Sequence, residues 1–234
     1  LLFISIIIFR TVDKSFYGLY VVLLSLFAVV ELLMAGFNDT IVRFLKDKIP
    51  LSDKQNIVFF VLIYKYLLIL LFILFAIIAR KYGFFEYLIS NYNEIKDDVD
   101  SFLLIVILNG IFSVIIGVNN CILNSQLEYK YTANIALIRN ISFLVIVIIL
   151  SLNTSEYLYY LYSGLLVSAS ILLMLSFKIF NEFNEFSIAS IIKSNFHFNT
   201  GKKYIFSYAA PLTISSLLTY VKNYLPTLIL GKEF

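Results

Sequence analysis

The chain has 234 residues, of which 61% are hydrophobic and 14% are charged, with a net charge of +3 and a mean hydropathy of +0.91. Soluble domains are roughly 45–50% apolar and about 25% charged, and a soluble chain this apolar lacks the polar groups to cover its own surface. The composition therefore excludes an ordinary soluble domain, and the absence of a basic patch in any polar segment excludes a nucleic-acid partner.

The apolar segments predict an all-α fold, a polytopic bundle of transmembrane helices. A membrane-spanning helix needs ~20 predominantly apolar residues. Residues 1–9 are too short to span, and we interpret them as the end of a truncated first helix. The complete predicted spans are residues 17–37, 57–79, 101–123, 133–151, 157–177 and 204–230. None of these runs alternates apolar and polar residues as the strands of a membrane barrel do, so we expect about six or seven helical crossings.

The connections between these spans predict the orientation of the chain. Nine Lys and Arg residues fall in connections 38–56, 124–132 and 178–203, against six on the other side. An excess of basic residues marks the cytoplasmic side, so the acidic connection 80–100 is expected outside.

The connection 178–203 is the longest polar one and the best boundary between two bundles. Phe180, Phe183 and Phe186 recur in it at helical spacing. The segment is therefore either a plain linker or an amphipathic helix that lies along the membrane surface.

Four ionisable residues lie inside the predicted spans: Glu31, Lys65, Arg139 and Lys222. A charge at membrane depth costs at least ~2.5–3.5 kcal/mol, so it usually faces a bundle interior or an aqueous cavity. We therefore predict that the three cations bind an anionic substrate. Arg139 is only about 9 Å deep, and snorkelling to the headgroups is the alternative for it. Glu31 is either the counter-ion of one of these cations or an ion-coupling residue.

The span 101–123 carries small and amide side chains at steps of three and four residues, which places them on one helical face. They are Asn109, Ser113, Gly117, Asn120 and, just beyond the span, Asn124. This face either packs against another helix or lines a polar lumen. In a lumen, Asn109 and Asn120 would contact the substrate.

Enzyme signatures are missing from the sequence. It contains no HExxH, CxxC, GxSxG or phosphate-binding Gly-rich motif. The single cysteine, Cys121, lies in an apolar run, and the single histidine, His197, lies in a connection without metal-ligand neighbours. We therefore expect no catalytic residue, metal or cofactor, and no enzymatic activity.

Two segments carry a resemblance to a known family. One is FYGLY at residues 16–20, continuing through Gly36 to Arg43 and Phe44. The other is residues 204–231, with SYAAPL at 207–212 and LILG at 228–231. Both resemble the bacterial polysaccharide-biosynthesis transporters that flip undecaprenyl-pyrophosphate-linked oligosaccharides, such as the O-antigen units of lipopolysaccharide. These transporters belong to the multidrug/oligosaccharidyl-lipid/polysaccharide exporter superfamily.

The resemblance implies two six-helix lobes around a cationic cavity, with one or two further helices in some members. Residues 1–177 would form the N-terminal lobe, 178–203 the cytoplasmic linker, and 204–234 the truncated first helix of the C-terminal lobe. The implied protein is a flippase of the bacterial cytoplasmic membrane. Its implied partners are the lipid bilayer, the lipid-linked oligosaccharide and other polysaccharide-assembly proteins. The family's motifs assign no binding residues, so Lys65, Arg139 and Lys222 rest on membrane depth alone.

Three alternatives stay open. A drug/cation antiporter of the same superfamily would favour acidic cavity residues, whereas Glu31 is outnumbered here by three cations. A multi-pass polysaccharide polymerase, ligase or acyltransferase would typically need a large external loop or a catalytic His/Arg/Asp group. A non-catalytic membrane subunit is the third.

Overall fold

The computed structural model describes residues 2–12, 14–88, 96, 98–193, 208–215 and 218. Within these ranges the chain forms helices and no strand. Lys222, His197 and most of the predicted span 204–230 lie outside the described residues. Their predicted roles stay predictions.

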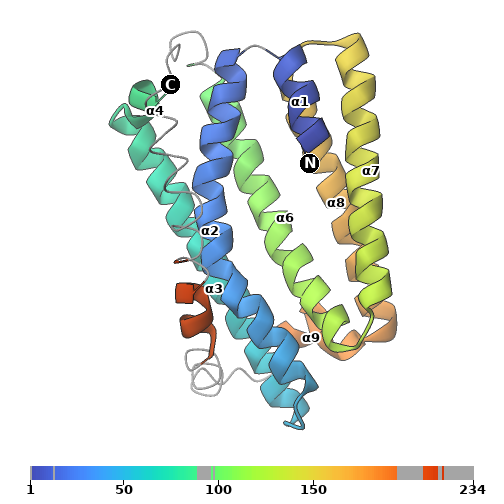
Figure 1. Ribbon diagram of the computed structural model, residues 1–234. Coiled ribbons are helices and arrows are strands. Elements are labelled where there is room, and N and C mark those ends of the chain that lie inside the picture. Colours follow the sequence, from blue (N-terminus) through green and yellow to red (C-terminus); the bar gives the residue numbers. More distant parts are fainter. Residues whose placement is uncertain are drawn as a thin grey trace.

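The helices follow one another along the chain with short connections (Figure 1). They are α1 (Leu2–Thr11), α2 (Lys14–Lys46), α3 (Leu51–Lys81), α4 (Phe84–Leu88), α6 (Val99–Ser125), α7 (Tyr129–Asn153), α8 (Tyr157–Glu182), the 3-10 helix η1 (Asn184–Phe186) and α9 (Ile188–Lys193). Four of them, α3, α6, α7 and α8, are long and apolar enough to cross a membrane. The predicted all-α membrane bundle is therefore confirmed, while the count of six or seven crossings stays a prediction.

The helices extend beyond the predicted spans where the sequence turns polar. Predicted span 17–37 lies inside α2, which continues to Lys46, and α3 begins at Leu51 instead of residue 57. Hydropathy marks the hydrocarbon depth, whereas a helix ends where its backbone is interrupted. Pro50 precedes α3, and Gly83, whose φ is +69°, allows the turn from α3 into α4.

Helix α6 is the centre of the bundle. It packs against α2, α3 and α8, while α7 packs on α8 and on α1. A close approach between α2 and α6 occurs at Gly110, where an added Cβ would lie 2.8 Å from the Phe27 ring. The outer faces of α3 and α7 expose apolar side chains such as Leu70, Ile77 and Leu137, as expected for faces in contact with lipid.

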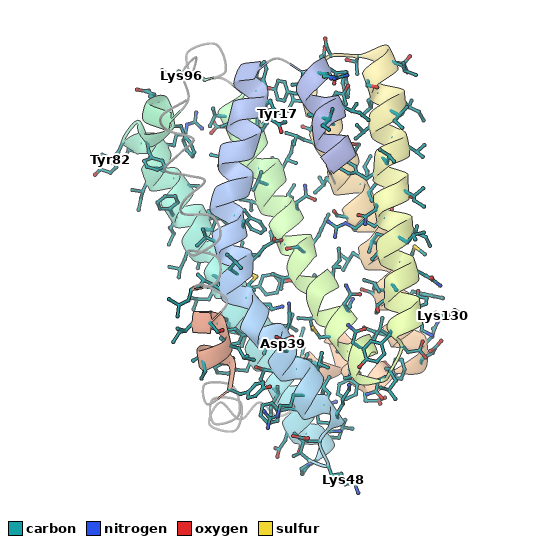
Figure 2. All side chains as sticks on the ribbon, in the orientation of Figure 1. Tyr17, Asp39, Lys48, Tyr82, Lys96 and Lys130 are labelled. Carbon is teal, nitrogen blue, oxygen red and sulfur yellow. The ribbon has the colours of Figure 1, made fainter. Side chains whose placement is uncertain are left out.

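The residues labelled in Figure 2 show which connections lie at each end of the bundle. Lys48 and Lys130 lie toward one end, and Tyr82 and Lys96 lie at the other (Figure 2). The predicted cytoplasmic connections 38–56 and 124–132 thus share an end. At that end the Lys46 ammonium donates a hydrogen bond of 2.8 Å to the Tyr129 hydroxyl.

The connection after α8 folds back onto the bundle. Phe180 is still on α8 and is exposed, Phe183 is half-buried, and Phe186 is buried in the main hydrophobic core. These three side chains do not form the single exposed apolar face that a helix on the membrane surface needs. The arrangement contradicts the surface-helix interpretation of this part of the connection.

The predicted topology can be tested at one exposed residue from each end. Ser52→Cys and Lys81→Cys, each in a Cys121→Ala background, place single thiols on exposed positions. An impermeant maleimide applied to intact cells is expected to label Lys81→Cys alone and to label both after permeabilisation. Labelling of Ser52→Cys in intact cells would show that the chain has the opposite orientation in the membrane.

Candidate functional site

The polar face of α6 is partly exposed along its length. Each of the five predicted residues, from Asn109 to Asn124, keeps an intermediate exposure. Asn124 accepts a hydrogen bond of 2.9 Å from the Thr132 hydroxyl and so holds the start of α7. The side-chain oxygen of Asn120 is enclosed and has no hydrogen-bond partner among the described residues. A buried acceptor without a partner is costly, so this oxygen is available to a donor on a ligand.

Arg139 and Glu31 are exposed members of otherwise buried helix faces. On α7, Arg139 lies four residues after Ile135 and eight before Val147, both of which are buried. On α2, Glu31 lies four residues after Phe27 and three before Met34, which are also buried. Residues at these steps share one helical face, yet both charged side chains are exposed. Each charged side chain is therefore exposed beside buried residues of its own helix.

The two charges act on one another. The Arg139 guanidinium is close enough to interact electrostatically with the Glu31 carboxylate. Their helices, α7 and α2, flank α6 in Figure 1. The two helices thus contribute opposite charges to one region, which favours the counter-ion alternative for Glu31.

Lys65 lies in the packed interior and not on an exposed surface. Its side chain is 1% exposed, and its ammonium donates a hydrogen bond to the side-chain oxygen of Asn38 on α2. A Cβ added at Gly117 of α6 would lie 3.6 Å from the Lys65 nitrogen. The ammonium therefore packs against the polar face of α6 at Gly117, the one position among these five residues without a side chain.

Asn38 was missed by sequence reasoning. It lies seven residues after Glu31 and therefore on the same face of α2, which is the signal that could have identified it. With Lys65 and Gly117, it joins α2, α3 and α6 at one buried polar contact.

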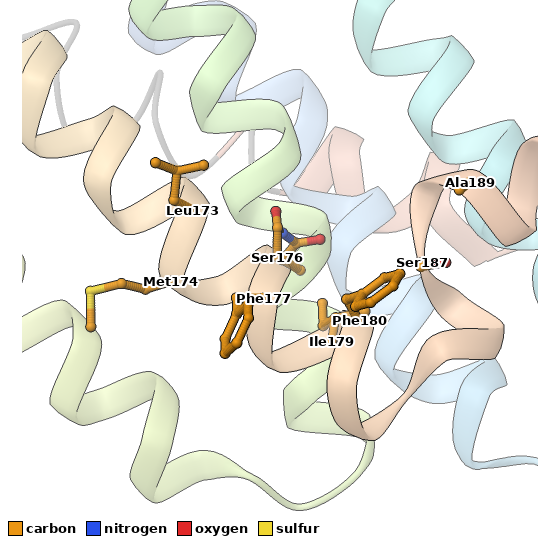
Figure 3. Close-up of a pocket in the computed structure, with 9 residues that line it drawn as sticks. Leu173, Met174, Ser176, Phe177, Ile179, Phe180, Ser187 and Ala189 are labelled. Carbon is orange, nitrogen blue, oxygen red and sulfur yellow. The ribbon is translucent and has the colours of Figure 1, made fainter.

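A pocket of about 650 Å³ lies between α8, α6 and the η1–α9 segment (Figure 3). Its lining is mostly apolar and includes Leu173, Phe177 and Phe180. The polar part is a hydrogen bond of 3.1 Å from the Asn119 amide to the Ser176 hydroxyl. Among its described lining residues none carries a charge. The pocket thus offers nothing to compensate an anionic substrate, and the polar face of α6 is the better candidate site.

The profile of the family described as "Polysaccharide biosynthesis protein" matches residues 2–232. The chain belongs to this family. Comparison with curated proteins and with solved structures gives no match. Family and fold together make this a multi-pass membrane protein of transporter type with a role in polysaccharide biosynthesis.

This family member shows no metal centre in the part of its chain that the structure describes. No three His, Cys, Asp or Glu side chains gather there in a group that could hold an ion. The groups that the candidate site offers are the charges of Arg139 and Lys65 and the amides of α6.

The space at Gly117 gives a prediction for this polysaccharide biosynthesis protein. Gly117→Leu extends beyond a Cβ that would already contact the Lys65 nitrogen and must displace the ammonium from Asn38, so we expect transport to fall about tenfold, as loss of one charged hydrogen bond would cause. Gly117→Ala should have little effect, because 3.6 Å is an ordinary van der Waals contact. Glycan export at matched protein levels is the measurement. Normal export by Gly117→Leu would show that export does not depend on the position of the Lys65 ammonium at Gly117.

Proposed function

We propose that the protein is a flippase that moves an undecaprenyl-pyrophosphate-linked oligosaccharide, an O-antigen or capsule repeat unit, across the bacterial cytoplasmic membrane. The observation that carries the proposal is the polar face of α6, against which the buried Lys65 packs at Gly117, together with the exposed Arg139 on α7. A pyrophosphate and a glycan cannot cross hydrocarbon unaided. These residues supply positive charge for the pyrophosphate and hydrogen-bonding groups for the glycan.

Each residue has a defined part in this mechanism. Arg139 binds the pyrophosphate through paired N–H donors, which a guanidinium presents in a planar fork. Lys65 adds positive charge beside Gly117, and Lys222 belongs to the same proposed set. The amides of Asn109 and Asn120 donate to and accept from sugar hydroxyls. Glu31 neutralises Arg139 when the substrate is absent.

Transport follows from two lobes that rock about this site and expose it to each side in turn, as in other secondary transporters. Pro211 and Pro226 interrupt the predicted span 204–230 and provide places where that helix bends. Substrate bound to Arg139 from the cytoplasmic side would then be released outside.

A drug/cation antiporter is the second candidate, and the exposed Glu31 carboxylate is the observation that favours it. An exposed carboxylate would bind an organic cation, but Arg139 beside it opposes that binding. The cations near the α6 face therefore favour an anionic substrate.

Complementation tests the proposal against the antiporter. The full-length protein is expressed in the producing bacterium after deletion of its chromosomal gene. We expect surface glycan to return and the lipid-linked precursor to stop accumulating. Restored resistance to cationic drugs without any change in surface glycan would show that the protein is an antiporter instead.

A further inference from the structure

A second cavity lies at the end of the bundle opposite the basic connections. Its volume is about 630 Å³, within the usual range for small-molecule sites. It is formed by the α1–α2 connection, the residue before α6 and the α7–α8 connection. The side chains used below are Thr11, Phe16, Asp98, Ser155, Glu156 and Tyr157.

One wall of this cavity rests on a stack of three aromatic rings. The Phe16 and Tyr157 rings have centroids 3.8 Å apart and an interplanar angle of 20°. Behind them, the buried Phe102 ring is stacked on Tyr157 at 4.5 Å and 12°. The three rings come from α2, α8 and α6, so the tertiary fold positions them and holds them nearly parallel.

The rest of the lining is polar and acidic. Asp98 and Glu156 contribute carboxylates, and Thr11 and Ser155 contribute hydroxyls. The Tyr157 hydroxyl is enclosed beside the Asp98 carboxylate and is close enough to donate a hydrogen bond to it.

We propose that this cavity is a glycan-binding subsite, in which a sugar ring lies against the aromatic wall and its hydroxyls donate to Asp98 and Glu156. The proposal rests on the proposed function. Aromatic rings present a negative face that attracts the weakly positive C–H groups of a sugar. Ionised carboxylates are strong acceptors for its O–H groups.

The lining of this cavity is unfavourable for the pyrophosphate of the substrate. Among the described lining residues none is basic and two are acidic, which disfavours a pyrophosphate here. Arg139 lies fourteen residues before the end of α7 at Asn153, about 20 Å along the helix. A short oligosaccharide whose pyrophosphate is bound at Arg139 can reach this end of the bundle, which the predicted topology places outside.

The test measures sugar binding directly. The probe is the oligosaccharide released by mild acid from the lipid carrier of the producing bacterium. Saturation-transfer NMR is recorded with the detergent-solubilised full-length protein. We expect transfer to ring protons in the wild type, and a loss of about fivefold or more when the stacked ring is removed in Tyr157→Ala.

Two further variants keep the test independent of folding. Asp98→Asn with Glu156→Gln preserves shape while removing both carboxylates, and it should also lose transfer. Tyr159→Ala removes an exposed tyrosine two residues from Tyr157 that does not line the cavity, and it should bind like the wild type.

The outcomes separate this subsite from the proposed function. Saturation transfer that is undiminished in both Tyr157→Ala and the carboxylate double variant overturns the subsite. Displacement of the sugar by tetraethylammonium at equal concentration also overturns it and assigns the cavity to an organic cation. A protein that flips lipid-linked glycan in vesicles without binding the released sugar has no such subsite. Specific sugar binding without flipping supports the subsite and contradicts the flippase.

Discussion

Replacing Arg139 by alanine in the full-length protein is expected to lower glycan export about ten- to one-hundredfold, because a hydrogen bond to a charged group contributes about 1.5–3 kcal/mol. Arg139 is an exposed residue on a buried face of α7, so its removal leaves the packing of that helix intact. The lost contact is the one to the pyrophosphate. Export is measured as surface glycan formed per amount of protein in the membrane.

Two controls accompany this substitution. Arg139→Lys should recover only part of the activity, since lysine keeps the charge but lacks the paired donors of a guanidinium. Lys130→Ala removes an exposed cation at the start of the same helix and should leave export unchanged. Full export by Arg139→Ala would mean that this arginine snorkels to the headgroups and takes no part in transport.

Replacing Lys65 by methionine is expected to abolish most export while leaving the protein at least as resistant to heat. Methionine fills a similar unbranched volume, and exchanging a buried charge for an apolar side chain is often neutral or stabilising. If the lysine served only to join α2 and α3 through Asn38, the substitution would cost no activity. A loss of about tenfold or more, equal to about 1.4 kcal/mol, would therefore reflect charge supplied to the substrate.

Asn38 allows the structural part of this contact to be measured separately. Asn38→Ala leaves the buried ammonium without its acceptor and should destabilise the fold by about 1–3 kcal/mol. Adding Lys65→Met should remove that penalty, because the two residues form one contact and their effects do not add. Leu68→Met, a buried and volume-conserving change on the same helix, is the matched control. Normal export by Lys65→Met would restrict Lys65 to helix packing.

The predicted spans of this bundle follow from one property of the sequence. Long uninterrupted apolar runs leave helices as the structure that satisfies the backbone in lipid, and α3, α6, α7 and α8 agree with the predicted spans. The helix ends were less predictable. α2 continues nine residues beyond Phe37, to Lys46, because polar residues do not by themselves stop a helix.

The sequence could predict which residues share a face of α6, but it could not predict which residues of other helices contact that face. Helical spacing places Asn109, Gly117 and Asn120 on one side of α6, as found. Spacing within one helix cannot say which neighbouring helix packs there. For that reason the position of Lys65 beside Gly117 and its contact with Asn38 could not be predicted from one helix, because they depend on the packing of three helices.

The stack of Phe16, Tyr157 and Phe102 is a second contact between helices that the sequence could not predict. Phe16, Phe102 and Tyr157 are far apart in sequence, and each is an ordinary apolar residue at the end of a span. Their parallel arrangement depends on α2, α6 and α8 all beginning at the same end of the bundle. No local pattern in the chain encodes that arrangement.

The most direct test of the flippase account is translocation in purified vesicles. The full-length protein is reconstituted into liposomes that contain a fluorescent undecaprenyl-pyrophosphate oligosaccharide, and a glycosidase added outside cleaves only the outward-facing glycan. We expect all of the glycan to become cleavable with wild-type protein, and only the outer half with Arg139→Ala or without protein on the same time scale. Equal rates with and without the wild-type protein would contradict the account.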